Sequence, residues 1–427
     1  MTMWVAGGQA PATSGGGERW SGVARSADVP RGGKLRVQSL GRELLVFRGA
    51  DGVAHVCDAY CPHLGADLGV RSKVVGNTVQ CAFHGWRFDG EGQCVKVPYC
   101  DKIPARAKIR TWPTREKDGL ISFRHDMEED APPGGHRGAG AAPMERAAPV
   151  QVDPRPLGWF AVAFSSDLPL GEDHEGVLAT EPYRLRRGRD GGLSFSWAKG
   201  GTGLLVEQNG VVLAWHHPQG SAPHFHVPKL PDAGWTLPET KLWHLRSHPQ
   251  ETFEQTVDSA HFTTSHDYGD VEALQPLRCE GPELSVRYQF VRKYPLVVLP
   301  NLRVQFETRL YGLGCAHNHA EVPALGLRMR SLLLSTPTEP GRVEHRSVVW
   351  LARDGWMGSS RLLAPLICRS VARGVWHDLE QDNPIWDNKR YVAPPVLVAT
   401  DGPIGAYRRW CTQFYSAAAG REAVAEP

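Results

Sequence analysis

Two short motifs of this 427-residue chain each place a histidine close to a cysteine. Cys61 is followed by His63, and Cys81 is followed by His84, with glycines beside each motif. Two loops that each offer one thiolate and one imidazole suit a [2Fe–2S] cluster, in which one iron takes two cysteines and the other takes two histidines. A structural zinc site is the alternative, although zinc motifs usually pair like ligands within one loop. The motifs therefore predict a [2Fe–2S] cluster.

A second group of candidate ligands lies in residues 250–268, which we expect to be helical. The stretch contains Glu254, Asp258, His261 and His266. At about 100° per residue, Asp258 and His261 share one helix face, whereas His261 and His266 are about 140° apart. Both histidines meet one metal ion only if the helix ends or bulges between them. Two histidines and one carboxylate on one face of a metal form the ligand set of ferrous oxygenases, which leaves positions open for O2.

The sequence around the first two motifs resembles the Rieske domain of ring-hydroxylating and steroid-hydroxylating oxygenases. The segments DAYCPHLGADL, CAFHGWRFDGEGQC and VPY carry this resemblance, which covers most of residues 17–127. Respiratory Rieske proteins have one more cysteine in each loop, where this chain has Ala66 and Ala82-Phe83. The second group of ligands is similar to the catalytic domain of the same oxygenases. The nearest branch is that of 3-ketosteroid 9α-hydroxylases and cholesterol 7-desaturases.

The resemblance implies a role for each residue of the second group. His261 and His266 bind a mononuclear Fe(II). Asp258 is a bridge between subunits, because it accepts hydrogen bonds from an iron-bound histidine and from a cluster histidine of the neighbouring subunit. Gln255 replaces an asparagine that many relatives have, so we expect altered surroundings of the iron and retained activity.

The resemblance also implies that the carboxylate ligand stands far downstream, four residues before a tryptophan. This spacing selects Asp382, which precedes Trp386. Asp378 and Asp387 remain alternatives, in that order. Trp386 is itself a candidate wall of the substrate pocket.

An oxygenase component of this family implies particular partners. The sequence has no nucleotide-binding fingerprint and no plant-type ferredoxin cysteine run. We therefore expect electrons from a separate NAD(P)H-dependent reductase, with or without a ferredoxin, and O2 as co-substrate. The resemblance further implies a cyclic homotrimer in which the cluster of one subunit serves the iron of the next.

The expected reaction is the hydroxylation or desaturation of a bulky apolar substrate, such as a steroid, a terpenoid or an aromatic natural product. We expect Phe262, Val297, Phe306, Leu334 and Trp386 to form pocket walls. Ring dioxygenation, oxidative cyclisation and demethylation are alternatives within the family. An electron-transfer protein that lacks the catalytic iron, or a lipid-binding module, would be a different class.

Composition excludes several classes of protein. The formal net charge is +2, with 48 basic and 46 acidic residues and no basic block, which argues against nucleic acid as the main partner. No apolar run approaches the roughly 20 residues of a membrane-spanning helix. The nine cysteines do not form a secreted disulfide pattern, and the N-terminus lacks the apolar stretch of a signal peptide. We therefore expect a cytoplasmic protein.

The order of strand, helix and linker patterns along the chain predicts an α+β protein of several domains. Residues 1–16 are expected to be a disordered lead-in, residues 17–130 an all-β Rieske domain, and residues 131–155 a linker rich in Pro, Gly and Ala. Residues 231–420 mix strand and helix patterns, which favours a helix-grip-like catalytic domain in which helices cover an antiparallel sheet.

An internal match suggests an origin for the remaining residues, 156–230. Residues 20–32 align with residues 159–171 at an offset of 139, and residues 118–125 align with residues 209–216 at an offset of 91. The difference of 48 residues is about the size of the stretch that holds the cluster motifs. We therefore predict a second, shortened copy of the Rieske domain that lost its metal-binding loops, the alternative being coincidence between amphipathic strands.

Overall fold

The computed structural model describes residues 4–5, 19–125, 153–292, 301–354, 359–360 and 362–415. The chain folds as two compact units, which are described separately. Unit 1 comprises residues 1–150 and 388–400, and unit 2 comprises residues 151–387 and 401–427.

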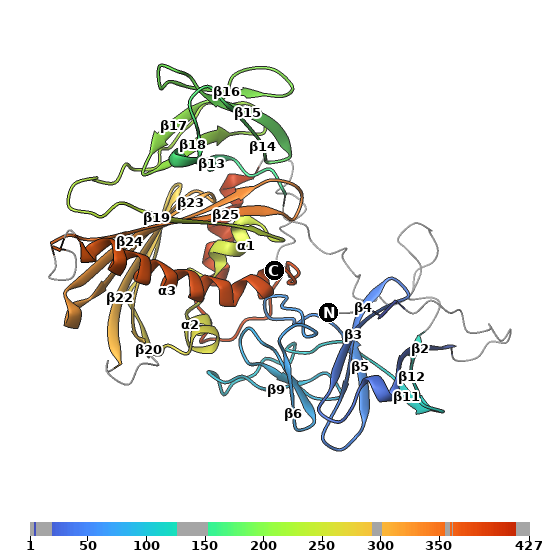
Figure 1. The fold of residues 1–427 in the computed structure, drawn as a ribbon. Coiled ribbons are helices and arrows are strands. Elements are labelled where there is room, and N and C mark those ends of the chain that lie inside the picture. Colours follow the sequence, from blue (N-terminus) through green and yellow to red (C-terminus); the bar gives the residue numbers. More distant parts are fainter. Residues whose placement is uncertain are drawn as a thin grey trace. The chain divides into compact units, whose positions relative to one another are not determined.

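Unit 1 is built from β-sheets, as expected for the N-terminal domain (Figure 1). The first sheet contains, in spatial order, β1 (Trp4–Val5), β3 (Lys34–Ser39), β4 (Arg42–Arg48), β5 (Ala54–Asp58) and β10 (Thr111–Trp112). The second contains β11 (Thr114–Lys117), β12 (Leu120–His125) and β2 (Arg19–Arg25), and the 3-10 helix η1 (Ser26–Asp28) follows β2. The third contains β6 (Lys73–Val75), β7 (Thr78–Gln80), β8 (Arg87–Phe88) and β9 (Cys94–Lys96). Strand β1 lies within the expected disordered lead-in and pairs parallel to β3, so that expectation is wrong for these two residues.

Unit 2 contains a large antiparallel sheet and four α-helices within the described residues. The large sheet has the order β19 (Glu239–Leu245), β25 (Val343–Leu351), β24 (Leu327–Pro337), β23 (Cys315–Val322), β22 (Leu302–Tyr311), β21 (Glu283–Arg292) and β20 (Gly269–Glu280). The helices are α1 (Pro249–Glu254), α2 (Ser259–His266), α3 (Leu363–Trp386) and α4 (Ile404–Cys411), with 3-10 helices η3 (Pro323–Leu325) and η4 (Thr412–Phe414). This confirms the α+β expectation.

Helix α3 lies along one face of the large sheet and packs against β25 and β19 (Figure 1). Its apolar side chains Leu379 and Trp386 form a core cluster with Leu245 and Val343 of those strands. Because a helix that buries one apolar stripe has a fixed rotation, this packing also fixes the direction of the polar side chains between them.

Two small sheets of unit 2 repeat the strand pairing of unit 1. The first contains β13 (Gly158–Phe164), β18 (Val211–His216) and β17 (Leu205–Gln208), with η2 (Ser165–Asp167) after β13. Strand β2 pairs with β12 as β13 pairs with β18: Trp20 lies opposite Arg124, and Trp159 lies opposite Trp215. These positions differ by the offsets of 139 and 91 residues found in the sequence, and both ladders contain a bulge at the matching place.

The other small sheet, β14 (Asp173–Leu178), β15 (Glu181–Arg187) and β16 (Leu193–Trp197), repeats β3, β4 and β5 with every strand boundary shifted by 139 residues. An ion pair recurs as well. Arg48 lies 2.8 Å from Glu116 in unit 1, and Arg187 lies 2.6 Å from Glu207 in unit 2. The strand order, the bulge and the ion pair all support the hypothesis that residues 156–230 are a copy of the Rieske scaffold.

The two copies differ in one stretch. Residues 59–113 of unit 1 stand where unit 2 has only residues 198–204. The longer stretch holds both Cys/His motifs and the sheet of β6 to β9. The loss of this insertion would remove the cluster site and leave the surrounding scaffold intact.

Residues 388–400, which we call the strap, differ from the predicted domain boundaries. They were expected to belong to a continuous catalytic domain over residues 231–420, but they pack in unit 1. The local sequence could not indicate this, because the strap has no strand or helix and is held by tertiary contacts.

Equivalent core positions of the two copies provide a test of their independence. Val46 and Leu185 are separated by the same offset, and both are 0% exposed. We predict that Leu185→Ala lowers the free energy of unfolding of unit 2 by about 2–5 kcal/mol and leaves the cluster absorbance intact. Val46→Ala should instead destabilise the unit that binds the cluster. Denaturation followed by both cluster absorbance and tryptophan fluorescence distinguishes the two, and equal loss of cluster absorbance in both variants would contradict the prediction.

Candidate metal centres

The two Cys/His loops have the same backbone turn. One loop follows β5 and the other joins β7 to β8. The N–H of Gly65 donates to the carbonyl of Cys61 at 3.0 Å, and that of Gly85 donates to the carbonyl of Cys81 at 3.1 Å. Both glycines have positive φ, 77° and 67°, which a side chain would strain. Each glycine therefore lets its loop fold back beside its own ligands.

Like ligands of the two loops pair with each other. The imidazoles of His63 and His84 have centroids 4.5 Å apart, and the thiols of Cys61 and Cys81 share a hydrogen bond. All four side chains are buried. Within the described residues, only one group of three or more potential ligands has its ligand atoms within 4.8 Å of one another. That group does not include any of these four side chains. The four ligands do not surround one point as zinc ligands do, and a cysteine pair beside a histidine pair fits a [2Fe–2S] cluster.

The two thiols have opposite acidities. Burial raises the pKa of Cys61 well above its ordinary value. The hydrogen bond with Cys61 lowers the pKa of Cys81 to about 7, despite its burial. Because cluster ligands are thiolates, cluster binding must displace the proton that lies between these sulfurs.

Two aromatic residues that were not expected from the sequence support the histidines. The ring of Trp86 stacks on His63 with centroids 4.5 Å apart and an interplanar angle of 9°. The indole N–H of Trp86 donates to the hydroxyl of Tyr99 at 2.9 Å. Both residues belong to the segments that carry the family resemblance, which is the signal that could have found them.

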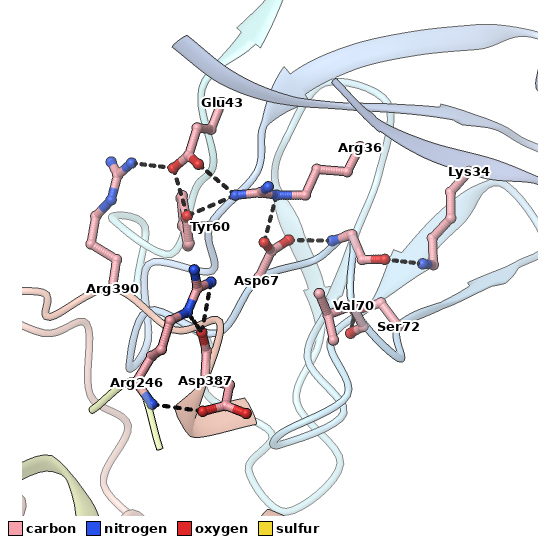
Figure 2. Close-up of polar contacts among 11 residues, drawn as sticks. Lys34, Arg36, Glu43, Tyr60, Asp67, Val70, Ser72, Arg246, Asp387 and Arg390 are labelled. Carbon is pink, nitrogen blue, oxygen red and sulfur yellow. Dashed lines mark hydrogen bonds and ion pairs between the residues drawn. The ribbon is translucent and has the colours of Figure 1, made fainter. Parts of the chain in front are cut away.

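Charged side chains brace the first cluster loop at both ends (Figure 2). Arg36 lies 2.6 Å from Asp67, at the end of the loop, and 2.5 Å from Glu43. The hydroxyl of Tyr60, just before the first cysteine, donates to Glu43 at 2.6 Å. Arg390 of the strap lies 2.9 Å from Glu43 and stacks over the ring of Tyr60. The loop is thus held by unit 1 itself as well as by any bound cluster.

The strap also contacts the backbone of this loop. The N–H of Arg390 donates to the carbonyl of Gly65 at 2.9 Å, and that of Val396 donates to the carbonyl of Pro62 at 3.1 Å. A Cβ atom on Gly65 would lie 1.7 Å from the carbonyl oxygen of Arg390. Gly65 is therefore required for close approach of the strap as well as for its backbone conformation.

The predicted iron ligands converge in unit 2. Nε2 of His261 lies 3.1 Å from Oδ1 of Asp382, and Nε2 of His266 lies 3.4 Å from Oδ2 of the same carboxylate. One ligand atom from each residue lies within 4.8 Å of the others. Helix α2 supplies both histidines and α3 supplies the carboxylate. Two imidazoles and one carboxylate in this arrangement are the donor set that suits a non-haem ferrous ion.

The electrostatics of the site favour an ionised carboxylate. Burial alone would raise the pKa of Asp382, but the two imidazoles lower it to about 2. Burial lowers the pKa of His266, yet the hydrogen bond and charge of Asp382 outweigh this effect and raise it. Nδ1 of His266 donates to the side-chain oxygen of Gln381 at 3.0 Å, which turns Nε2 toward the carboxylate. Gln381 was not expected, because no motif singles it out.

The helical stretch differs from the prediction. Helix α1 ends at Glu254 and α2 begins at Ser259, so the break lies before the histidines and not between them. Asp258 is the N-cap of α2, where its carboxylate accepts the backbone N–H of His261 at 3.3 Å. Aspartate is a favoured N-cap, which explains why the helix restarts there. His266 is the last residue of α2, and its ring lies 4.4 Å from that of His261 without a bulge between them.

The alternative carboxylates have other partners. Asp378 forms an ion pair with Arg292 at 2.9 Å and accepts the hydroxyl of Tyr268 at 2.7 Å. Asp387, the C-cap of α3, accepts the backbone N–H of Arg246 at 2.7 Å, as Figure 2 shows. Neither belongs to the group of three ligands.

A cavity of about 340 Å³ borders the three ligands. Its walls come largely from apolar side chains at alternate positions of β22, β23 and β24. Phe262 and Phe306 line it as predicted, and Gln255 contributes an amide. The cavity is at the small end of the range of about 300–1,000 Å³ for ligand pockets.

Two predicted walls do not line this cavity. Leu334 faces the other side of β24, because strand side chains alternate and its neighbour Leu333 takes the cavity side. Trp386 stands one helical turn beyond Asp382, and its ring packs in the core near His345. Val297 lies outside the described residues.

Family models and curated relatives agree with this architecture. The model of the Rieske [2Fe-2S] domain matches residues 19–113, and that of the 3-ketosteroid 9alpha-hydroxylase C-terminal domain matches residues 214–415. The cholesterol 7-desaturase of Xenopus laevis is 25% identical over 423 residues, which cover 93% of this chain and 71% of the relative. A probable 3-ketosteroid-9-alpha-monooxygenase oxygenase component of Rhodococcus rhodochrous is 25% identical over 413 residues, covering 93% and 79%.

The solved structure of Pseudomonas putida NdmA with caffeine is 17% identical, and the match covers 96% of this chain and 95% of that chain with a TM-score of 0.31. One matched domain contains the candidate cluster ligands, and the other contains the candidate iron ligands. Together the two domains define a Rieske-type oxygenase, and this chain is one. Within that class, its C-terminal domain matches that of 3-ketosteroid 9alpha-hydroxylases, and the curated relatives to which it is similar include a cholesterol 7-desaturase and a probable 3-ketosteroid monooxygenase component.

No helix within the described ranges combines the length and the apolar character that crossing a membrane requires.

Gly65→Ala tests the contact between strap and cluster loop. We predict loss of the cluster, because the new methyl group would collide with the carbonyl of Arg390. Gly41→Ala is the matched control: φ is 69° there, but nothing lies within 4 Å of the added Cβ, so the cost is a strain of about 1–3 kcal/mol. Visible absorbance, EPR and acid-labile sulfide measure the cluster. A Gly65→Ala protein with full cluster content would contradict the prediction.

Substitution of each candidate carboxylate tests the iron ligand. We expect Asp382→Asn to lower the iron content from about three to about two per chain, because only the mononuclear iron is lost. Asp378→Asn and Asp387→Asn should retain about three, since these residues have other partners. Anaerobic iron analysis after reconstitution measures this. Iron loss in the Asp378 variant alone would reassign the ligand.

Proposed function

We propose that this oxygenase hydroxylates or desaturates a bulky apolar substrate of the steroid class. It would use O2 and electrons from a separate NAD(P)H-dependent reductase, with or without a ferredoxin. The observation that carries the proposal is the convergence of His261, His266 and Asp382 beside an apolar cavity. The relatives named as acting on cholesterol and 3-ketosteroids support the substrate class. The Rhodococcus relative is named as an oxygenase component, which supports a separate electron donor.

The residues of the site fit a mononuclear iron. An iron bound there would activate O2, which amino-acid side chains cannot do on their own. His261, His266 and Asp382 would hold it, with Gln381 orienting one imidazole. Phe262 and the sheet side chains exclude water and position an apolar substrate.

Asp258 is proposed to link the two metal centres. Its carboxylate is 0% exposed within the chain and already accepts a backbone N–H of the ligand helix. A carboxylate has further lone pairs, so it can accept imidazole N–H groups at the same time. In the proposed cyclic homotrimer, one of these imidazoles would belong to the cluster of the neighbouring subunit. A purified holoprotein that sediments as a monomer would contradict this part of the proposal.

The cytoplasmic location is likewise proposed. None of the nine cysteines forms a disulfide bond, which suits a reducing compartment.

Two alternatives rest on the same architecture. An electron-transfer protein without catalytic iron would contain only the irons of its cluster. Ring dioxygenation, oxidative cyclisation or demethylation would use the same ligands and give different products. Iron content separates the first alternative, and product analysis separates the others.

The direct test combines the purified holoprotein with an NAD(P)H-dependent reductase, O2 and two probes, a 3-ketosteroid and cholesterol. We expect a product that has gained one oxygen atom or lost two hydrogens, detected by mass spectrometry with labelled O2. NAD(P)H oxidation that depends on no probe, with no product, would contradict the proposed substrate class.

Asp258→Asn adds a test of the bridge to the same assay. Asparagine is as good an N-cap as aspartate, so α2 and the iron content should persist. We expect turnover to fall about 10- to 100-fold because the charge that joins the centres is lost. Asp167→Asn, an exposed aspartate of unit 2, is the control. Full turnover in Asp258→Asn would contradict the proposal that Asp258 links the two metal centres.

A further inference from the structure

Four exposed leucines gather at the N-terminal end of α3. Leu362, Leu363 and Leu366 lie at its start and are 85%, 56% and 62% exposed. Leu237 is 84% exposed, and its carbonyl oxygen lies 4.0 Å from the thiol of Cys368 in α3. Leu362 and Leu237 are the two most exposed large apolar side chains among the described residues. We call these four leucines the leucine tip.

The tip continues into a basic face of the same helix. At about 100° per residue, Arg369 and Arg373 project from the side of α3 that carries Leu366. The buried residues Ala364 and Cys368 lie on the opposite side. Both arginines are exposed, and the sequence has no acidic residue between positions 362 and 377. The solvent face of this half of α3 is therefore apolar at its start and basic in the turns that follow.

The electrostatics of this end of α3 favour anions. Arg369 forms an ion pair with Glu239 at 3.3 Å, whereas Arg373 has no acidic partner within the described residues. The N-terminal end of a helix also carries partial positive charge from its aligned peptide dipoles. The leucine tip thus lies at the positive end of a helix that has basic side chains behind it.

The lining of the cavity reaches the surface beside the tip. Ser370 stands one helical turn beyond Leu366, and its side chain is exposed although it also lines the cavity. Leu325 and Leu327, which are half-buried, line the cavity as well. The apolar interior of the cavity therefore comes within about one helical turn of the exposed leucines.

A lipid surface fits this combination of features. Clustered exposed apolar side chains mark interaction sites. Helices that bind at a membrane surface place leucines about 5–10 Å into the boundary between headgroups and acyl chains, with arginines at the level of the headgroups. At 1.5 Å per residue, Arg369 and Arg373 stand about 5 and 10 Å behind Leu366 along the helix axis. When the tip is inserted, both guanidinium groups can therefore reach anionic headgroups.

We propose that the leucine tip docks this protein on an anionic lipid bilayer, so that a substrate dissolved in the bilayer enters the cavity beside Ser370. The docking rests on the tip and the arginines alone. The transfer of substrate rests on the proposed function, because an apolar molecule of the steroid class is driven out of water into a bilayer. Attachment of this kind is peripheral, so it is compatible with the proposed cytoplasmic location.

Vesicle binding tests the docking directly. Purified holoprotein is mixed with vesicles of phosphatidylglycerol and phosphatidylcholine in equal parts, or with vesicles of phosphatidylcholine alone, and bound protein is separated by flotation. We expect binding to the anionic vesicles, and weaker binding to the neutral ones. Binding to the anionic vesicles should weaken as salt is raised, because salt screens the charge of the arginines.

Matched substitutions distinguish the tip from other exposed leucines. Leu366→Gln changes the tip, and Leu170→Gln changes a leucine of the same exposure, 62%, outside α3. We expect the vesicle affinity to fall about 5- to 30-fold in Leu366→Gln and to stay unchanged in Leu170→Gln. Arg373→Gln should lower the affinity for anionic vesicles about 5-fold and reduce its salt dependence. Because all three positions are exposed, iron and cluster content should equal those of the wild type.

Two presentations of one probe test the transfer of substrate. Cholesterol or a 3-ketosteroid is offered either in anionic vesicles or as a soluble cyclodextrin complex, with reductase and O2. We expect Leu366→Gln to oxidise the probe in vesicles about 5- to 30-fold more slowly than the wild type does. It should oxidise the probe in cyclodextrin at the wild-type rate.

The outcomes separate the docking from the proposed function. No vesicle binding, or equal affinity in the wild type and Leu366→Gln, would overturn the docking and leave the oxygenase function in place. Self-association of the wild type that Leu366→Gln abolishes, measured by sedimentation velocity without vesicles, would assign the tip to a second copy of the chain and also overturn the docking. Vesicle binding without oxidation of either steroid in either presentation would overturn the proposed function and leave the docking in place.

Discussion

One buried carboxylate organises the catalytic half of this protein. Asp382 is 1% exposed and carries a negative charge that burial would disfavour, so its ionisation depends on the two imidazoles that face it. They meet only because α3 is anchored on the large sheet by Leu379 and Trp386, and because Asp258 starts α2 at the right residue. The iron site is therefore the product of helix packing and helix capping, and a change in either would move a ligand.

The candidate metal ligands could be predicted from the sequence, but the packing contacts that position them could not. Cys61, His63, Cys81 and His84 lie in two local motifs, and the spacing of Asp382 from a tryptophan was recognisable by family resemblance. That tryptophan proved to be a core anchor and not a cavity wall. Its direction depends on the rotation of α3 against two strands, which no local pattern encodes.

The break of the ligand helix was misplaced for a related reason. An ideal helical angle between His261 and His266 demanded an interruption, but two long side chains at the end of a helix converge without one. The predicted internal copy was easier to find, because strand register preserves sequence offsets as long as no residue is inserted. Neither family match covers residues 114–213, so most of that copy was visible only through the chain's similarity to itself.

The strap gives the chain an unusual order of assembly. Most of unit 1 precedes unit 2 in the sequence, yet residues 388–400, which bond the carbonyls of Pro62 and Gly65, leave the ribosome only after residues 151–387 of unit 2 have been made. Domains usually fold in the order in which they are synthesised. Here the first cluster loop lacks its hydrogen bonds to the strap while residues 151–387 of unit 2 are translated. Cluster delivery during that interval would act on a more open loop than the finished protein has, and a transcript truncated before the strap would encode a cluster domain that lacks its last supporting segment.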